Sequence, residues 1–307
     1  MALQELVCFF AQSSVFEDVS EMFSKIFPIK LSANQILRVS EWYGKQIDPI
    51  IEANHTIYIP ELPRKKQDEE TTYVMIDGSM VYTREEKWKE MKLGRIFHHR
   101  DNVKVSTKRK EVIRSVFVSH LGSVEAFSPK LERHLTPYRN LTFIGDGAKW
   151  IWNIVENNYP GARQILDFYH ANEKLELFAK HHFRNQEKKS QWLHIQKELL
   201  LNDQVAEVID QLKALKPRNV EARGAKEDAI HYYIEHEDRM MYKTYLQLDL
   251  LIGSGPIEAA HRKVIHQRLK LSGQRWSIPG AQATANLRCY KSGGHWNIIQ
   301  NLLRLAA

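Results

Sequence analysis

The feature that most constrains the fold is an alternation of short apolar runs with amphipathic stretches between residues 73 and 170. The apolar runs have the length of β-strands, and the amphipathic stretches repeat their apolar residues at helical spacing. Strands are expected at residues 73–76, 91–99, 112–119, 141–144 and 164–166, and helices at 123–135, at 148–158 and from about His170. Three strands followed by alternating helices and strands predict an α/β sheet with helices on its faces.

The sequence on both sides of this region is predicted to be helical. Three short helices are expected at 3–11, 15–26 and 32–48, the last one starting with a capping box of Ser32 and Gln35. The expected division is a helical module (1–59), a linker with two prolines and mixed charges (60–71), the first part of the core (72–173), an all-helical insertion (174–250) and a C-terminal part that completes the core (251–307). Two of the C-terminal helices are expected within 278–305.

The role of the N-terminal helices stays open at this stage. Three small helices are compatible with a helix-turn-helix module, but residues 3–52 contain four basic and seven acidic side chains. A protein that reads the major groove normally carries positive charge for the phosphates. A packing or dimerisation module is therefore an equally good interpretation.

The composition predicts a folded, cytoplasmic protein. The chain has 307 residues, of which 43% are hydrophobic, and no apolar run approaches the roughly 20 residues of a membrane span. Its first residues lack the basic stretch of a signal peptide, so we expect no membrane association. Cys8 and Cys289 are too few and too far apart for a zinc ribbon or a disulfide framework, and both are expected to be free thiols.

A single carboxylate, Glu258, lies at the start of a predicted helix that is otherwise basic. Ser254 and Pro256 suit the first turn of a helix, where an acidic side chain is also favourable. From Glu258 to Arg304 there are eight Lys or Arg residues and one acidic residue, so this segment carries a net charge of +7, as does the whole chain. A metal ion held near a phosphate backbone would explain a lone acid in such surroundings.

Two aspartates, Asp77 and Asp146, follow predicted strands and are flanked by Gly78, Gly145 and Gly147. Ligands of α/β sheets gather at the carboxyl ends of strands, although Asp-Gly is also common in simple turns. Together with Glu258, these carboxylates would suit two Mg²⁺ or Mn²⁺ ions, which favour oxygen ligands and can activate an attacking water or 3′-hydroxyl. The sequence has no Walker A loop, dinucleotide fingerprint or serine-hydrolase elbow.

Three sequence blocks carry a resemblance to a known family: DGSMVYTREEKWKEMKLGRIF, GDGAKWIWNIVENNYPGARQILDFYHANEKL and IGSGPIEAAHRKVIHQRLKLSGQRWS. They resemble, in the same order and over about residues 71–290, bacterial insertion-sequence transposases of the ISKra type. These are DDE enzymes with an RNase H-like core. The resemblance implies that Asp77, Asp146 and Glu258 are the catalytic, metal-binding triad. It also implies 3′-end cleavage and strand transfer on DNA, with terminal inverted repeats and target DNA as partners.

Handling two DNA ends at once implies a homodimer or a larger synaptic assembly, associated with the nucleoid when bound to DNA. Two other interpretations stay open: an RNase H-like nuclease that cuts without strand transfer, and a transposase-derived DNA-binding protein without catalysis. Both would retain the fold, so only an assay with the ends of the element separates them.

Further side chains are candidates for supporting roles. Asp167 and His170 resemble a position that supports the catalytic site in related transposases, although capping of the next helix is an equally good interpretation. DNA-backbone contacts are expected, with a solvated face as the alternative, for Arg262, Lys263, Arg268, Lys270 and Arg275. Trp276 fits the core better than stacking on a base, and the Lys108-Arg109-Lys110 run would face DNA or water.

Overall fold

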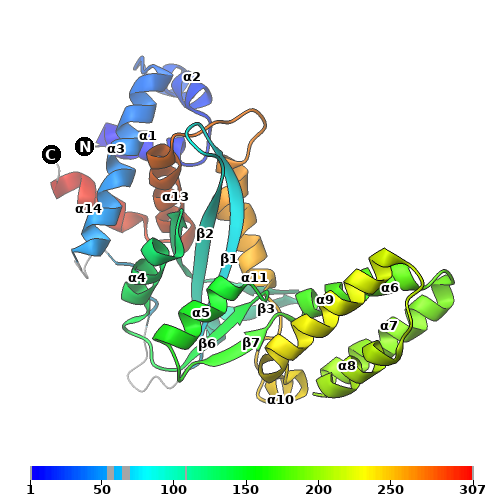
Figure 1. Cartoon of the computed structure of the whole chain (residues 1–307). Helices are drawn as coiled ribbons and strands as arrows, with labels where there is room; N and C mark the ends of the chain where they lie inside the picture. Colours follow the sequence, from blue (N-terminus) through cyan, green and yellow to red (C-terminus); the bar gives the residue numbers. More distant parts are fainter. Residues whose placement is uncertain (1, 54–58, 64–69, 108, 306–307) are drawn as a thin grey trace. The chain divides into compact units, whose positions relative to one another are not determined.

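The computed structural model describes residues 2–53, 59–63, 70–107 and 109–305 (Figure 1). As the sequence predicts, the protein is mixed α/β, with a mixed five-stranded sheet flanked by helices and a helical N-terminal module, consistent with an RNase H-like arrangement. The chain forms two compact units, which we call unit 1 (1–141 with 256–307) and unit 2 (142–255). None of the helices in the described ranges has both the length and the apolar character that crossing a membrane requires.

The three N-terminal helices belong to the same compact unit as the first strands. They are α1 (Ala2–Ala11), α2 (Phe16–Ile26) and α3 (Ala33–Glu52). The expected capping box is present, since the side chains of Ser32 and Gln35 each accept from the other's backbone N–H. Helix α3 packs on the C-terminal helix α13 (Ile278–Gly293), and Gly44 permits this close approach because a Cβ there would collide with the carbonyl of Ala283. Residues 64–69 of the expected linker lie outside the described residues.

The first two strands form a long antiparallel hairpin (Figure 1). They are β1 (Thr72–Thr83) and β2 (Lys87–His98). The sequence predicted that the first strand ends at Asp77-Gly78, and this is wrong, because Asp77 pairs with Leu93 and Gly78 with Lys92 in the middle of the hairpin. The Asp-Gly pair is thus part of a strand rather than a turn, and the missing Cβ of Gly78 leaves room for the carboxylate of Glu90.

The third core strand lies later in the chain than predicted. Strand β5 spans Val116–Leu121 and pairs antiparallel with β2. Much of the sequence just before it forms a separate hairpin of β3 (Asn102–Ser106) and β4 (Arg109–Val112), after the short 3-10 helix η2 (His99–Asp101). Arg109 and Lys110 are exposed on β4, whereas Lys108 lies outside the described residues.

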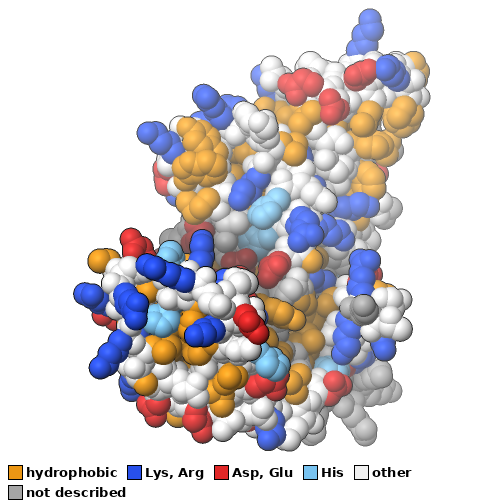
Figure 2. Space-filling view, turned by 90° about the vertical axis from the view of Figure 1, so that its right-hand side faces the viewer, with side chains coloured by type: hydrophobic (Ala, Val, Ile, Leu, Met, Phe, Trp, Pro, Cys, Tyr) orange, Lys and Arg blue, Asp and Glu red, His pale blue; other side chains and the backbone are white. Residues whose placement is uncertain are grey.

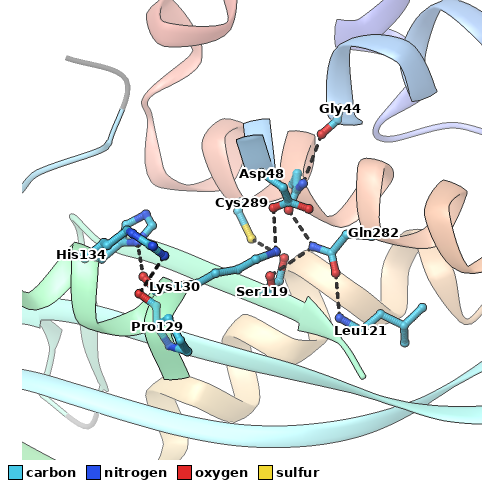
Figure 3. Close-up of polar contacts among 11 residues, drawn as sticks. Gly44, Asp48, Ser119, Leu121, Pro129, Lys130, His134, Gln282 and Cys289 are labelled. Atoms are coloured by element: carbon cyan, nitrogen blue, oxygen red, sulfur yellow. Dashed lines mark hydrogen bonds and ion pairs between the residues drawn. The ribbon is translucent and has the colours of Figure 1, made fainter. Parts of the chain in front are cut away.

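A group of buried and partly buried polar side chains joins the helices of unit 1 to β5 (Figure 3). Helix α4 (Val124–Leu135), which matches the helix expected at 123–135, is capped by Ser123 and contributes Lys130, which lies 2.7 Å from the Asp48 carboxylate of α3. Gln282 of α13 donates to the carbonyl of Ser119 and accepts from the backbone N–H of Leu121. These contacts hold α3, α4 and α13 together against one strand.

The C-terminal part of unit 1 is helical, as predicted. It consists of α11 (Gly255–Ala260), a π-helical stretch η4 (His261–His266), α12 (Gln267–Leu269), α13 (Ile278–Gly293) and α14 (Trp296–Leu305). Gly294 ends α13 with a φ of 80°, a left-handed conformation that favours glycine. Cys8 and Cys289 are both free and buried, as expected.

Unit 2 combines two parallel strands with a group of helices. Strands β6 (Leu141–Gly145) and β7 (Arg163–Leu166) pair in parallel and are linked by α5 (Lys149–Asn158). The predicted all-helical insertion consists of α6 (Phe168–His182), α7 (Gln186–Leu201), α8 (Val205–Ala214), α9 (Val220–His236), η3 (Glu237–Arg239) and α10 (Tyr242–Gln247). Helices α6 to α9 pack in sequence order, and α6 also packs on α9.

Candidate active site

Two of the three predicted catalytic carboxylates line the same pocket in unit 1. Asp77 comes from the middle of β1 and Glu258 from the first turn of α11, and the pocket has a volume of about 470 Å³. The other side chains and backbone segments around it belong to Gly78, Ser79, Met80, His261, Arg262, His266 and Lys270. The pocket therefore combines two carboxylates with the cationic Arg262 and Lys270.

The carboxylate of Asp77 is held from two sides. One oxygen, Oδ1, accepts the backbone N–H of Gly78 at 2.6 Å, and the other, Oδ2, lies 3.6 Å from Nε2 of His261. The second ring nitrogen of His261, Nδ1, lies 3.1 Å from the hydroxyl of Ser79. Ser79 is two residues after Asp77 on the same strand, so both side chains project from the same face of β1.

His261 is neutral at physiological pH. Its ring is only 2% exposed, and this burial lowers its pKa to about 4, with the positive charges of His266 and Lys270 acting in the same direction. A neutral imidazole adds no positive charge beside the carboxylate of Asp77.

Arg95 of β2 holds the start of the Glu258 helix. Its guanidinium is 8% exposed and donates to the carbonyl of Pro256 at 2.6 Å, to Ser115 at 2.9 Å and to the carbonyl of Val112 at 3.2 Å. Burial lowers the pKa of Arg95 to about 10, well above physiological pH, so the side chain stays charged. The hydrogen bond to Pro256 fixes the first turn of α11 against β2, and the bonds to Ser115 and Val112 hold the planar guanidinium in position.

The π-helical stretch after Glu258 is stabilised by another buried arginine. Arg288 of α13 is 5% exposed and donates to the carbonyls of Lys263, Val264 and Gln12. A π-helix disturbs the regular hydrogen bonding of an α-helix, and such insertions are frequent at functional sites. Here the irregular stretch places His261 in the pocket with Glu258.

Arg268 is not available for the DNA contact that the sequence predicted, and that prediction is wrong. Its side chain is 1% exposed, its Nε donates to the carbonyl of Ala11, and its guanidinium lies 4.7 Å from the ring centroids of both Phe16 and Trp276. The two aromatic rings stabilise the buried cation by cation–π contacts. Trp276 is likewise a core residue, as expected. The remaining predicted DNA contacts are exposed: Arg262, Lys263, Lys270 and Arg275.

Asp146 lies in unit 2, directly after β6. Its Oδ1 accepts the backbone N–H of Ala148 at 2.9 Å, which fixes the turn into α5. Gly147 has a φ of 98°, and a side chain there would collide with the ring of Tyr232. Glycine is therefore required beside Asp146 both by the backbone conformation and by the space.

Asp167 and His170 form an ion pair in the same unit. Asp167 caps α6 by accepting the backbone N–H groups of Tyr169 and His170, and Oδ2 of Asp167 also accepts from the N–H and hydroxyl of Ser254. Burial acts to raise the pKa of Asp167, but the hydrogen bonds from His170 and Ser254 outweigh it and lower the pKa. His170 Nδ1 lies 3.3 Å from Asp167 Oδ2, and this contact raises the pKa of His170 to about 9 despite partial burial.

The candidate residues thus fall into two groups. Asp77 and Glu258 share the pocket of unit 1, and Asp146 lies in unit 2 with Asp167 and His170, where the charge of Asp146 contributes to raising the pKa of His170. Among the described residues, no three His, Cys, Asp or Glu side chains lie close enough together to hold a metal ion. The donor chemistry nevertheless fits Mg²⁺ or Mn²⁺, because the candidates are carboxylates and the histidine beside Asp77 is uncharged.

Sequence reasoning missed several residues that shape this site. His261 follows Glu258 by three residues on the same helical segment, a spacing that places both on one side. Ser79, two residues after Asp77, could have been found from strand alternation once the strand was extended. Arg95 and Arg288 carry no local signal, since their partners are distant backbone carbonyls.

Comparison with known proteins shows a family match over most of the chain. The model of an uncharacterised protein family, UPF0236, matches residues 13–301, which is most of the chain. No curated protein matches the sequence.

Proposed function

This chain belongs to the uncharacterised protein family UPF0236, and we propose that it is a DDE transposase similar to the ISKra type. It would cleave the 3′ ends of an insertion sequence and join them to target DNA. The three sequence blocks described above support this proposal, because each contains one of the proposed catalytic carboxylates. The mixed sheet flanked by helices is compatible with the RNase H-like core of such enzymes.

One observation carries the proposal furthest: Asp77 and Glu258, which are distant in sequence, line one pocket together with Arg262 and Lys270. Carboxylates next to exposed cations suit a phosphodiester substrate, since the cations attract the phosphates and the carboxylates bind the metal ions. We propose that Asp146 completes the triad.

The bound metal ions, Mg²⁺ or Mn²⁺ and two in number, would activate the attacking oxygen and stabilise the leaving oxygen. Asp77, Asp146 and Glu258 would hold them. The neutral His261 keeps the neighbouring Asp77 free of a competing imidazolium charge, and Ser79 orients the His261 ring. Arg95 keeps Glu258 in place by fixing the start of its helix.

His170 and the exposed basic residues would act on the DNA rather than on the metal. Because its pKa is raised to about 9, His170 is a cation at neutral pH and suits a contact with a phosphate. Arg262, Lys263, Lys270 and Arg275 would bind the DNA backbone, which requires only exposed positive charge and no base recognition. A dimer or larger assembly would hold the two transposon ends together.

The deciding experiment is a plasmid excision and integration assay with the terminal inverted repeats of the element. We expect Asp77→Asn, Asp146→Asn and Glu258→Gln each to reduce product by at least about a thousandfold, because each removes a negative metal ligand. DNA affinity should stay within a few-fold of wild type in a mobility-shift assay. Glu132→Gln, on the exposed surface of α4, is the matched control and should retain full activity.

The outcomes separate the proposal from its rivals. Cleavage without joining would indicate a nuclease, and binding of the repeats without cleavage would indicate a DNA-binding protein. Full activity of Asp146→Asn would contradict the triad. The same three variants, tested for Mn²⁺ binding by electron paramagnetic resonance, should each bind the metal more weakly than wild type and the Glu132→Gln control.

A further inference from the structure

A second pocket lies in unit 1 beside the carboxylate pocket, and the proposed catalytic residues do not line it. It has a volume of about 410 Å³ and is formed by the tip of the β1–β2 hairpin and the loop that follows α12. Tyr82 and Trp88 contribute from the hairpin, and Leu271, Lys270 and Arg275 from the loop. Lys270 lines both pockets, so the two are adjacent.

The aromatic side of this pocket is open to solvent. Trp88 is 60% exposed, an unusual position for a large aromatic side chain, and it meets Tyr82 edge-on with ring centroids 5.3 Å apart. The contact with Tyr82 restricts the Trp88 ring, and the exposure of that ring leaves surface on which another planar group can stack. Leu271 adds apolar surface and is 40% exposed.

The cationic side of the pocket is formed by Lys270 and Arg275, both of which are exposed. Figure 2 shows one face of the protein surface, where Lys and Arg side chains lie next to hydrophobic patches. An exposed aromatic ring flanked by cations is the combination that binds single-stranded nucleic acid, because the ring stacks on a base and the cations hold the neighbouring phosphates.

The loop that forms the pocket is anchored at its end. The backbone N–H of Trp276 donates to the carbonyl of Tyr82 at 3.2 Å, and that of Arg84 donates to the carbonyl of Trp276 at 2.8 Å. The buried Arg268 packs on the Trp276 ring and so also holds the end of this loop in place. Within the loop, Gly273 adopts a φ of 75°, which allows the tight turn. A pocket that is already formed loses little entropy when it binds a ligand.

We propose that this pocket binds an unpaired DNA base, which stacks on Trp88 while Lys270 and Arg275 contact the adjacent phosphates. Lys270 would place this nucleotide next to the strand in the carboxylate pocket. The choice of DNA as the ligand rests on the proposed function, whereas the stacking site itself rests on the geometry of Trp88 and Tyr82.

The test compares the binding of two short single-stranded oligomers by fluorescence anisotropy in the presence of EDTA. One is an oligothymidylate, and the other is an abasic oligomer of the same length and charge. Wild-type protein should bind the oligothymidylate at least about fivefold more tightly, because stacking contributes only when a base is present. Trp88→Ala should abolish this preference and Trp88→Phe should keep most of it.

The matched control is Trp42→Ala, because Trp42 is also an exposed tryptophan of unit 1, 47% exposed on α3, and packs edge-on against a tyrosine. It should leave the preference unchanged. Equal binding of both oligomers by wild type, or an unchanged preference in Trp88→Ala, would overturn the inference. Circular dichroism melting of Trp88→Ala, expected to match wild type, excludes misfolding as the cause.

Failure of the proposed function gives a different pattern. Asp77→Asn should retain the preference for the oligothymidylate, since no metal or chemistry is involved. A Trp88-dependent preference in a protein that never cuts DNA would support the base pocket and reject the transposase. DNA cutting without a Trp88-dependent preference would support the transposase and reject the base pocket.

Discussion

Each of the two units contains an aspartate next to a histidine. The histidine is neutral in unit 1 and positively charged in unit 2. In unit 1, His261 lies 3.6 Å from Asp77 and its pKa is lowered to about 4. In unit 2, His170 lies 3.3 Å from Asp167 and its pKa is raised to about 9. The residue types are the same, so the surroundings decide the charge.

Burial and hydrogen bonding account for the difference. His261 is almost fully buried, and its partners at hydrogen-bond distance are uncharged: the hydroxyl of Ser79 and the backbone of Asp77. His170 keeps about a third of its side chain exposed and faces a carboxylate that Ser254 and the α6 backbone hold in its ionised form. Desolvation dominates in the first pair and the ion pair in the second. A neutral histidine suits a metal site, and a charged one suits a phosphate.

The largest effect is expected when the carboxylate of the pair in unit 2, that of Asp167, is removed. Asp167→Ala deletes the cap of α6, the acceptor for Ser254 and the partner of His170, so we expect unfolding of unit 2 to be easier by about 2–4 kcal/mol. Urea denaturation followed by circular dichroism measures the effect. Asp167→Asn keeps one oxygen acceptor and should lose less. Stability equal to wild type in Asp167→Ala would mean that Asp167 does not organise this unit.

A smaller effect is expected when a fixed charge replaces the neutral histidine of unit 1. His261→Lys places a cation where it competes with a metal ion for Asp77, and we expect Mn²⁺ affinity to fall by about tenfold or more. His261→Gln, which is uncharged, is the control and should stay within about threefold of wild type. Electron paramagnetic resonance of Mn²⁺ reports both affinities. Equal affinities in the two variants would show that the charge at this position is unimportant.

Much of the framework of the two sites could be predicted from the sequence. The cap at Ser32, the helix at 123–135 and the strands at 141–144 and 164–166 were correctly located, because their signals lie within a few neighbouring residues. The hairpin was underestimated because Asp-Gly normally ends a strand, and its continuation depends on cross-strand pairing with Leu93 and Lys92.

The direction of the basic side chains could not be predicted. The concentration of positive charge after Glu258 suggested a surface for DNA, yet Arg268 and Arg288 point into the core. Their partners are Phe16, Trp276 and backbone carbonyls of distant segments, which only the fold brings together. A count of charged residues gives the net charge of a segment, but it does not show which of the charged side chains are exposed to solvent.

The pH dependence of stability tests the positive charge of His170. Because the pKa of His170 is higher in the folded protein than the ordinary value of 6.5, its proton stabilises the fold fully below pH 6.5, and this contribution is lost as the pH rises through about 9. In metal-free protein, the free energy of unfolding of wild type should therefore exceed that of His170→Gln below pH 6.5, and this difference should disappear as the pH rises to about 9. The advantage should be below about 1 kcal/mol, since the ring is partly solvated.

Direct titration gives the control for this prediction. In EDTA, nuclear magnetic resonance should show one histidine titrating near pH 9 that disappears in His170→Gln. The His261 resonance, identified with His261→Gln, should show no titration above about pH 5. Two histidines titrating together near pH 6.5 would remove the contrast between the two pairs.

An effect of similar small size is expected for Ser79, and it tests what orients the neutral ring. Nε2 of His261 lies 3.6 Å from Asp77, beyond hydrogen-bond length, whereas Nδ1 lies 3.1 Å from the Ser79 hydroxyl. If the hydroxyl donates to Nδ1, the proton of the ring sits on Nε2 and faces Asp77. Ser79→Ala should then cost about 0.5–1.5 kcal/mol of stability and mix the two tautomers, as nitrogen chemical shifts would report. An unchanged tautomer in Ser79→Ala would mean that Asp77, through its carboxylate and its backbone, fixes the ring without Ser79.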